Sequence, residues 1–120
     1  MNYKKLLTKL LLSVSLYATS SMAMEEDKIF VVERETSSLA IIENGMKSSN
    51  ILNMRNMNHG VVKFFDNDGY VISRDGYVIQ FDPRSEKILN EYKTSKSAIG
   101  FVVNKTYVAV ANYDDKSVDI

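Results

Sequence analysis

From Lys28 onward the sequence consists of short apolar runs separated by turn residues, and this pattern limits the chain to β-structure. The runs, four to six residues long, read "IFVV", "LAII", "VVKFF", "YVIS", "YVIQF", "KILNEY", "GFVV", "YVAVAN" and "SVDI". Runs of this length that are rich in Val, Ile, Phe and Tyr are typical of strands, and no 3.6-residue periodicity competes with them. The sequence therefore predicts an all-β chain of antiparallel hairpins.

Turn residues stand between the runs where hairpins need them. The segments "DNDG" at 66–69 and "DG" at 75–76 supply Asn and Gly, which tolerate positive φ angles. The segment "DPRS" at 82–85 places proline at the second position of a type I turn. These signals predict that consecutive strands pair with one another.

The strand pairs also repeat along the chain. "FVVERETSSLAII" from Phe30, "YVISRDGYVIQF" from Tyr70 and "YVAVANYDDKSVDI" from Tyr107 align, with spacings of 40 and 37 residues. A period of this size in an all-β chain is typical of the four-stranded blades of a β-propeller. Two to three blades do not close a ring, so we expect residues 24–120 to be the N-terminal part of a longer propeller.

Residues 1–23 have the pattern of a secretory signal peptide. Three lysines precede an apolar stretch, Leu10–Ala18, and small residues at 21 and 23 predict cleavage after Ala23. A membrane anchor is the alternative, but the stretch is interrupted by polar residues and is shorter than the roughly 20 residues of a spanning helix. We expect export to the periplasm and no stable membrane span.

Composition excludes several classes of function. The chain has no cysteine, which rules out disulfides, thiolate metal sites, a cysteine nucleophile and covalent attachment of a c-type haem. Without the three lysines of the signal, the chain keeps 12 basic and 15 acidic residues, a net charge of −3. Nothing in this balance indicates a nucleic-acid partner.

The only histidine, His59, is a candidate metal ligand. It lies in "NMNHG", just before the apolar run at 61–65, and the corresponding place in the next repeat is Lys96. A neutral imidazole at the entrance of an innermost propeller strand can ligate a metal or a haem iron through one ring nitrogen. The alternative is a surface histidine that bonds to its own loop.

Two arginines are candidate anion-binding residues. Arg34 and Arg74 each lie four residues after the first aromatic of their repeat, where the third copy has Ala111. Two guanidinium groups at the same end of neighbouring blades suit a ligand with several carboxylates, because each can hold one through two hydrogen bonds. The alternative is that both pair with nearby acids, Glu33, Glu35 or Asp75.

The segment "NMNHGVVKFFDNDGYVISRDGYVIQFDP" resembles the first blades of the eight-bladed propellers that bind heme d1, the cytochrome d1-type family. Its strongest pieces are "VVER" at 31–34, "NHG" at 58–60, "GYVISRDG" at 69–76 and "VAVANYDD" at 108–115. The resemblance covers residues 29–120. It implies a cytochrome d1-like propeller, eight blades in the full family, with about the first two to three blades present.

The resemblance also implies roles for individual residues. His59 falls where these propellers place the axial ligand to the heme d1 iron. Arg34 and Arg74 fall where arginines of the family hold the acidic side chains of the macrocycle. Tyr113, in "ANYDD", falls where a tyrosine approaches the same pocket.

The missing cysteines select among the members of this family. Its nitrite reductases, and a related d1-handling dehydrogenase, carry a c-type haem domain ahead of the propeller, and no such motif is present here. The resemblance therefore implies the NirF-like group of heme d1 biosynthesis: periplasmic proteins of denitrification that bind a late heme d1 precursor and assist nitrite reductase maturation. Other maturation proteins and nitrite reductase itself are the implied partners.

Three points stay open at this stage. Whether such a protein also catalyses a dehydrogenation is undecided, because the chain has no flavin or nicotinamide motif. The alternatives are a fragment of the d1 domain of a cytochrome nitrite reductase and a non-catalytic propeller that serves as a binding module. Some members of the group have a lipid-carrying cysteine at the cleavage site; here the pair is Ala23-Met24, which favours a protein without a lipid anchor.

Overall fold

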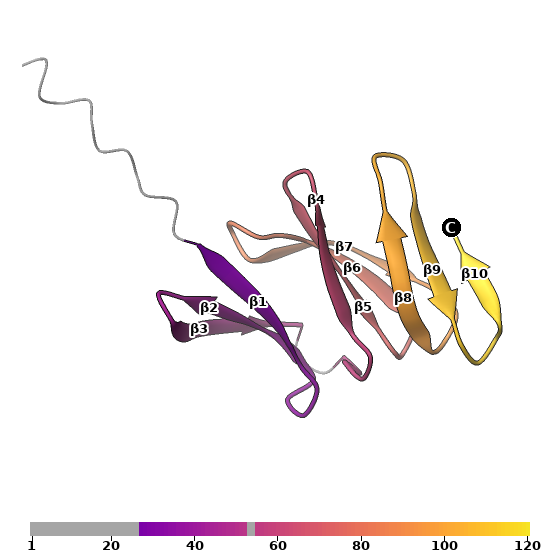
Figure 1. Cartoon of the computed structure of the whole chain (residues 1–120), viewed down its shortest axis with the longest axis horizontal. Coiled ribbons are helices and arrows are strands. Elements are labelled where there is room, and N and C mark those ends of the chain that lie inside the picture. The colour runs from indigo at the N-terminus through magenta and orange to yellow at the C-terminus, as the bar shows by residue number, and fades with distance from the viewer. Residues whose placement is uncertain (1–26, 53–54) are drawn as a thin grey trace, which may run out of the picture.

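The computed structural model describes residues 27–52 and 55–120, and the regular structure in these ranges is all β-strand (Figure 1). The predicted signal peptide, residues 1–23, lies outside the described residues. In the part of the chain that is described, no helix has the length and hydropathy needed to cross a membrane.

Within the described residues, ten strands form three antiparallel sheets, here called sheets A, B and C. Sheet A has the order β1-β2-β3 and contains β1 (Lys28–Glu33), β2 (Ser38–Glu43) and β3 (Met46–Ile51). Sheet B has the order β4-β5-β6-β7 and contains β4 (Val61–Phe65), β5 (Asp68–Ser73), β6 (Tyr77–Asp82) and β7 (Lys87–Lys93). Sheet C has the order β10-β9-β8 and contains β8 (Ala98–Val103), β9 (Val108–Asn112) and β10 (Ser117–Asp119). The prediction of an all-β chain of antiparallel hairpins is confirmed.

Each of the nine apolar runs forms or largely overlaps a strand, but one strand was not predicted. This is β3, whose sequence "MKSSNI" is mostly polar and whose first residues are exposed. It pairs with β2 across the turn residues Asn44 and Gly45, which have φ angles of 51° and 74°. Two successive positive φ angles are those of a type I′ hairpin turn, so the turn, rather than apolar residues, specifies this strand.

The three sheets repeat the same strand pattern. β1 begins at Lys28 and β5 at Asp68, which are 40 residues apart, and β9 begins a further 40 residues on at Val108. The pairing of β2 with β3 shifts register between Ile41 and Ile42, and that of β6 with β7 shifts between Gln80 and Phe81. Sheet A therefore corresponds to β5-β6-β7 of sheet B, and sheet C corresponds to β4-β5-β6.

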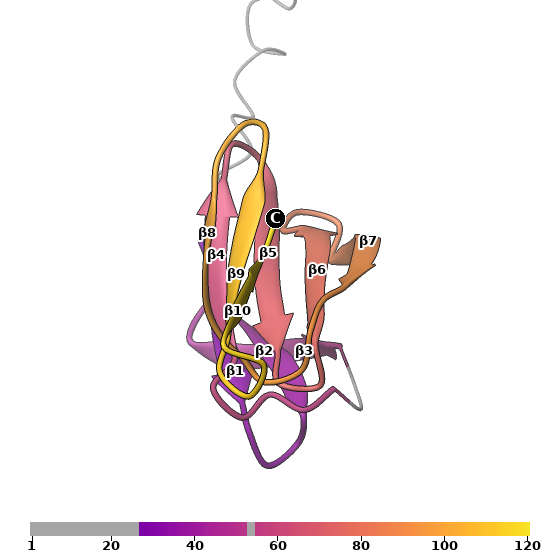
Figure 2. The same ribbon diagram turned by 90° about the vertical axis from the view of Figure 1, so that its right-hand side faces the viewer.

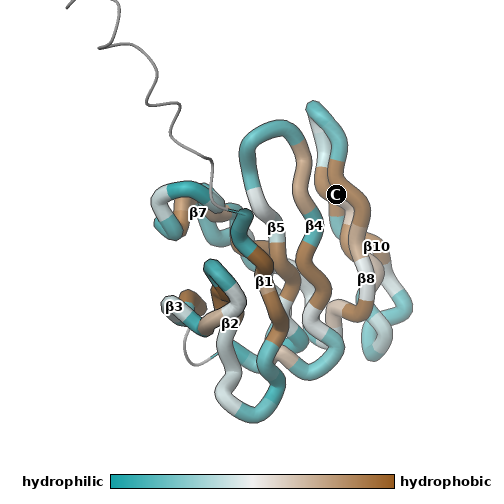
Figure 3. The backbone as a smooth tube through the Cα atoms, turned by 60° about the vertical axis from the view of Figure 1, so that its left-hand side comes forward, coloured by the Kyte–Doolittle hydropathy of each residue, from teal (hydrophilic) through white to brown (hydrophobic). Residues whose placement is uncertain are grey.

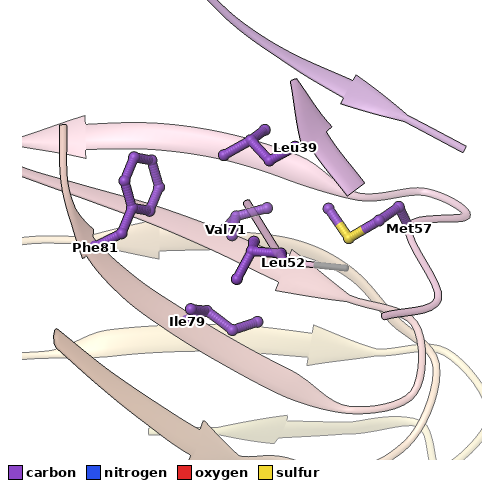
Figure 4. Close-up of a cluster of buried hydrophobic side chains, with 6 residues drawn as sticks. All are labelled: Leu39, Leu52, Met57, Val71, Ile79 and Phe81. Atoms are coloured by element: carbon purple, nitrogen blue, oxygen red, sulfur yellow. The ribbon is translucent and has the colours of Figure 1, made fainter. Parts of the chain in front are cut away.

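Two apolar clusters lie on the opposite faces of sheet B. The cluster between sheets A and B is formed by Leu39, Leu52, Met57, Val71, Ile79 and Phe81 (Figure 4). The cluster between sheets B and C is formed by Ile72, Val78, Ala98, Phe101 and Val110. Successive residues of β5 and β6 thus point to different clusters, as the two-residue period of a strand requires. Sheet B is packed on both faces, and β8 of sheet C lies against β4 and β5 of sheet B (Figure 2).

Candidate functional site

The four residues singled out in the sequence lie in loops at one end of the three sheets. Arg34 begins the β1–β2 turn, Arg74 the β5–β6 turn and Tyr113 the β9–β10 turn, while His59 lies just before β4. Figure 1 shows these turns, and the segments that enter β4 and β8, along the lower edge of the molecule. The antiparallel order places them there, because β1, β5 and β9 run in one direction and β4 and β8 in the other.

The loop that carries His59 is held in place by a buried side chain and by hydrogen bonds within the loop. Met57 is fully buried in the cluster between sheets A and B, and its carbonyl oxygen accepts a hydrogen bond of 2.9 Å from the backbone N–H of Gly60. The N–H of Asn58 donates to the side-chain oxygen of Asn56 at 3.0 Å. His59 itself has a φ angle of 62° and an exposed side chain. The loop therefore holds the backbone firmly and presents the imidazole to solvent.

Hydrogen bonds connect this loop to the turns on either side. On one side, Nη2 of Arg34 donates to Oδ1 of Asn58. On the other, the backbone N–H of Arg74 donates to the carbonyl oxygen of Asn56 at 2.7 Å. His59 is thus carried between the two arginine-bearing turns.

The same row of hydrogen bonds continues to the third turn. The carbonyl oxygen of Arg74 accepts a bond of 2.9 Å from the N–H of Ser97, and the carbonyl oxygen of Ser97 accepts one of 2.9 Å from the N–H of Tyr113. Ser97 is buried, whereas the side chain of Tyr113 is 68% exposed. All four predicted residues consequently belong to one hydrogen-bonded row along this edge, rather than to a closed pocket.

The structure corrects one alignment of the repeat. Arg34, Arg74 and Tyr113 each come directly after their strands β1, β5 and β9, so Tyr113 corresponds to the two arginines. Ala111, the predicted counterpart, lies inside β9. Counting from the first aromatic fails in the third copy because Tyr107 precedes β9, whereas the aromatics of the first two copies lie within their strands.

The surface beside His59 contains a shallow hollow of about 520 Å³. It is lined by Arg34, Glu35, Asn56 and Asn58. A guanidinium and two amides can donate hydrogen bonds to a carboxylate, although Glu35 adds a negative charge to the same rim. Of the predicted residues only Arg34 lines this hollow; His59, Arg74 and Tyr113 do not.

Sequence reasoning missed Arg55, which holds the loop onto sheet B. Its guanidinium lies 3.8 Å from the ring centroid of Tyr77, while Nη1 is 3.2 Å from Asp75 and Nη2 is 2.7 Å from Glu91. Burial disfavours the charged form of Asp75, but its hydrogen bonds, including those from Arg55 and the N–H of Asn56, outweigh this effect and lower the pKa of the carboxyl. No motif or spacing in the sequence indicates this residue, because its partners come from two segments that are 20 and 36 residues away in the sequence.

The ion pairs also bear on the alternative roles of the arginines. Glu33 binds Nζ of Lys47 at 2.8 Å, and Asp75 binds Arg55. The alternative interpretation was that Arg34 and Arg74 pair with nearby acids. Glu33 and Asp75 instead pair with Lys47 and Arg55. Among the described residues, no hydrogen bond to the side chain of Arg74 is found.

No protein-family model matches the chain, and no characterised protein matches it significantly.

Proposed function

We propose that sheets A, B and C are successive blades of a β-propeller, and that the loop row at their edge binds a tetrapyrrole, heme d1 or a late precursor of it. In this proposal His59 would bind the iron through a ring nitrogen, and Arg34 and Arg74 would bind carboxylates of the macrocycle. Tyr113 lies beside the ligand at the third blade. The protein acts in the periplasm as a maturation factor for heme d1.

The arrangement of the sheets supports the propeller. Propeller blades are four-stranded antiparallel sheets that pack face to face, and sheet B has this strand order with an apolar cluster on each face. The first strand of sheet C contacts the first strand of sheet B, as strands nearest a propeller axis do. The 40-residue spacing between corresponding strands is that of a blade repeat.

The observation that carries the ligand proposal is the attachment of the His59 loop to both arginine-bearing turns. The side chain of Asn58 accepts a hydrogen bond from Arg34, and the backbone carbonyl of Asn56 accepts one from the backbone N–H of Arg74, so the loop that carries His59 is attached to both turns along one edge. An imidazole is a ligand for haem iron, and guanidinium groups bind carboxylates through paired hydrogen bonds. A flat ligand with a central metal and acidic substituents matches this order of residues.

The residues present fit such a cofactor. Among the residues that the structure describes, no group of three or more His, Cys, Asp or Glu side chains could hold a metal ion, and a tetrapyrrole brings four nitrogen ligands of its own to an iron bound at His59. When bound, heme d1 supplies an iron that exchanges electrons and binds small ligands. The chain's own residues hold and orient the macrocycle: His59 by one ring nitrogen, and Arg34 and Arg74 by charge-assisted hydrogen bonds.

An optical titration of the purified chain with heme d1 tests this proposal. We expect a shifted absorption spectrum for the wild type and that of the free cofactor for His59→Asn. Asparagine is the appropriate replacement because it tolerates the positive φ angle of this position, so the loop keeps its conformation. Arg74→Gln should weaken binding about tenfold, which corresponds to one charge-assisted contact.

Lys105→Gln provides a matched control, because this lysine lies in the β8–β9 loop, away from the His59 loop row. Its binding should equal that of the wild type. The proposal is wrong if the folded wild type leaves the spectrum of heme d1 unchanged, or if His59→Asn gives the same shift as the wild type.

A non-catalytic binding module is the second candidate, and the open geometry favours it. The hollow at Arg34 is shallow, and Tyr113 projects its ring into solvent, as side chains that contact another protein do. A folded protein that is indifferent to heme d1 would support this candidate. Export is a separate proposal, checked by N-terminal sequencing of the secreted protein, which should begin at Met24.

A further inference from the structure

The turn between β2 and β3 consists of two residues, Asn44 and Gly45, and lies outside the loop row of His59. Glu43 pairs with Met46, so these two residues alone join the strands. Both are exposed, and Figure 3 shows β2 and β3 at the end of the molecule opposite sheet C. Asn44 is the only asparagine of the sequence that precedes a glycine.

An asparagine in this position can react with its own main chain. The backbone nitrogen of the glycine forms a bond to Cγ of the asparagine, the Cγ–Nδ2 bond breaks, and the amide nitrogen leaves as ammonia with the proton of the backbone N–H. Water then opens the cyclic imide. Opening at Cγ gives aspartate, and opening at the other carbonyl gives isoaspartate, in which the main chain passes through Cγ. A following glycine favours the reaction, because it has no Cβ atom to crowd the attacking nitrogen.

Both reacting groups of the β2–β3 turn are free. In residues 27–52 and 55–120, no hydrogen bond is found to the side chain of Asn44 or from the backbone N–H of Gly45. A Cβ atom at Gly45 would meet nothing within 4 Å, so the ring and the attacking water have open space around them. Neither a hydrogen bond nor a neighbouring group has to be displaced for the reaction to begin.

The turn Asp75-Gly76 has a similar sequence but the opposite surroundings. The backbone N–H of Gly76 donates to the carbonyl oxygen of Ser73 at 3.0 Å. The carboxylate of Asp75 accepts a hydrogen bond of 3.1 Å from the N–H of Asn56 and pairs with Arg55 at 3.2 Å. Both groups that would form the ring are therefore held in other contacts, and this turn is protected from the reaction.

We infer that Asn44 is a site of spontaneous deamidation and isoaspartate formation in the folded protein. Water is the only co-reactant, ammonia is released, and no electrons are transferred. The product carries a carboxylate beside Glu43 where the turn had a neutral amide. The inference rests on the turn alone and does not require tetrapyrrole binding.

The isoaspartate form changes the hairpin, because it lengthens the main chain of the turn by one carbon atom. The φ angles of 51° and 74° at Asn44 and Gly45 are those of a two-residue type I′ turn, which sets the pairing of Glu43 with Met46. A longer turn does not keep this pairing. The exposed first residues of β3, 46–48, should therefore exchange their amide hydrogens faster in the modified protein than in fresh protein.

Incubation of the purified chain at neutral pH, followed by digestion and mass spectrometry, tests the inference. The peptide that contains Asn44 should gain the mass difference between OH and NH₂, and enzymatic methylation of isoaspartate should label the same peptide. Asn44→Gly should lose both signals, since glycine keeps the turn but has no side chain to react. Asn104→Ser is the matched control and should keep both, because Asn104 lies in the β8–β9 loop and precedes a lysine.

Circular dichroism and cooperative unfolding confirm that each sample is folded during incubation. The inference is overturned if the wild type gains the mass only when it is unfolded in urea, because the folded turn would then protect Asn44. It is equally overturned if the change falls on another asparagine, or if Asn44→Gly gains the same mass as the wild type.

Discussion

Positive φ angles recur at corresponding residues of the three sheets, where the chain turns into the strands β2, β6 and β10. Ser37, Gly76 and Lys116 precede these strands with φ angles of 55°, 88° and 50°. Glycine adopts such angles at little cost, whereas a residue with a Cβ atom is strained there. The repeat therefore conserves a backbone shape while its residues differ, and this shape places Arg34, Arg74 and Tyr113 at the same edge.

A turn requires glycine for two reasons, a positive φ angle and the lack of space for a Cβ atom. Gly45 meets only the first, and Gly76 meets both. Both have positive φ angles, but a Cβ atom on Gly76 would lie 2.6 Å from the carbonyl oxygen of Ser95, while one on Gly45 meets nothing within 4 Å. We expect Gly45→Ala to lower the free energy of unfolding by about 1 kcal/mol, and Gly76→Ala by about 2–4 kcal/mol. Urea unfolding of both variants measures the difference. Equal losses would show that the contact with Ser95 relaxes without cost.

The candidate site was predictable only in part at the residue scale. The single histidine and the two arginines were evident from residue type and spacing, and the structure brings their loops together. Arg55 was not predictable, because its binding to Asp75, Glu91 and Tyr77 depends on tertiary contacts. The equivalence of Tyr113 with the arginines required the ends of the strands, which an alignment on aromatic residues does not give.

At the scale of elements, polar contacts at the opposite end of the sheets join A to B. Nζ of Lys28 on β1 is 2.7 Å from Glu86 in the β6–β7 turn and 3.0 Å from Glu43 on β2. The hydroxyl of Ser49 on β3 donates to Glu86 at 2.6 Å. These hydrogen bonds, from Lys28 first and then Ser49, lower the pKa of Glu86, and those to Glu86 and Glu43 raise the pKa of Lys28.

This network predicts a pH dependence of stability. Because the pKa of Glu86 is lower in the fold than in the unfolded chain, its contribution is complete above the ordinary glutamate pKa of about 4.3 and is lost as the pH falls through the folded value. Glu86→Gln should lower the free energy of unfolding by about 1 kcal/mol or less at pH 7, and should reduce the loss of stability on acidification. Urea unfolding between pH 7 and acid measures both effects. Glu35→Gln is the control, and an acid profile of Glu86→Gln identical to that of the wild type would contradict the prediction.

Strand β3 shows why element prediction failed at one place. Its first residues are exposed at the edge of sheet A, and only its last residue, Ile51, packs against an apolar cluster. Edge strands that face water need no alternating pattern, so hydrophobic periodicity does not reveal them. The pair Asn44-Gly45 was the available signal, since Asn-Gly between two segments indicates a two-residue hairpin.

At the scale of the whole molecule, Phe81 joins sheets A and B. Its side chain is fully buried, and its ring centroid lies 5.3 Å from that of Phe30 and 6.1 Å from that of Phe64. Phe81→Ala should lower the free energy of unfolding by about 3–5 kcal/mol, because it removes a ring and leaves a cavity. Phe64→Ala, at a ring that is 51% exposed, should cost clearly less. Similar losses in thermal or urea unfolding would mean that the two rings are equally important to the packing of A on B.

The fold class and the repeat were predictable because both depend on local patterns: β-branched runs, turn residues and a period of about 40 residues. The packing of the sheets was not, since it depends on which face of each strand is buried. Sheet B illustrates this, because Val71 and Ile72 are both fully buried although they point to opposite faces. A strand buried on both sides has no alternation to read.

This difference in burial predicts unequal protection from hydrogen exchange. Strands β5 and β6 are internal to sheet B and are covered on both faces. Their amides should therefore exchange with solvent only through global unfolding. The edge strands β3, β7 and β10 should exchange faster, because each has a neighbouring strand on one side only within the described residues. Mass spectrometry or NMR of native-state exchange measures this order. The prediction is wrong if β10 exchanges as slowly as β5.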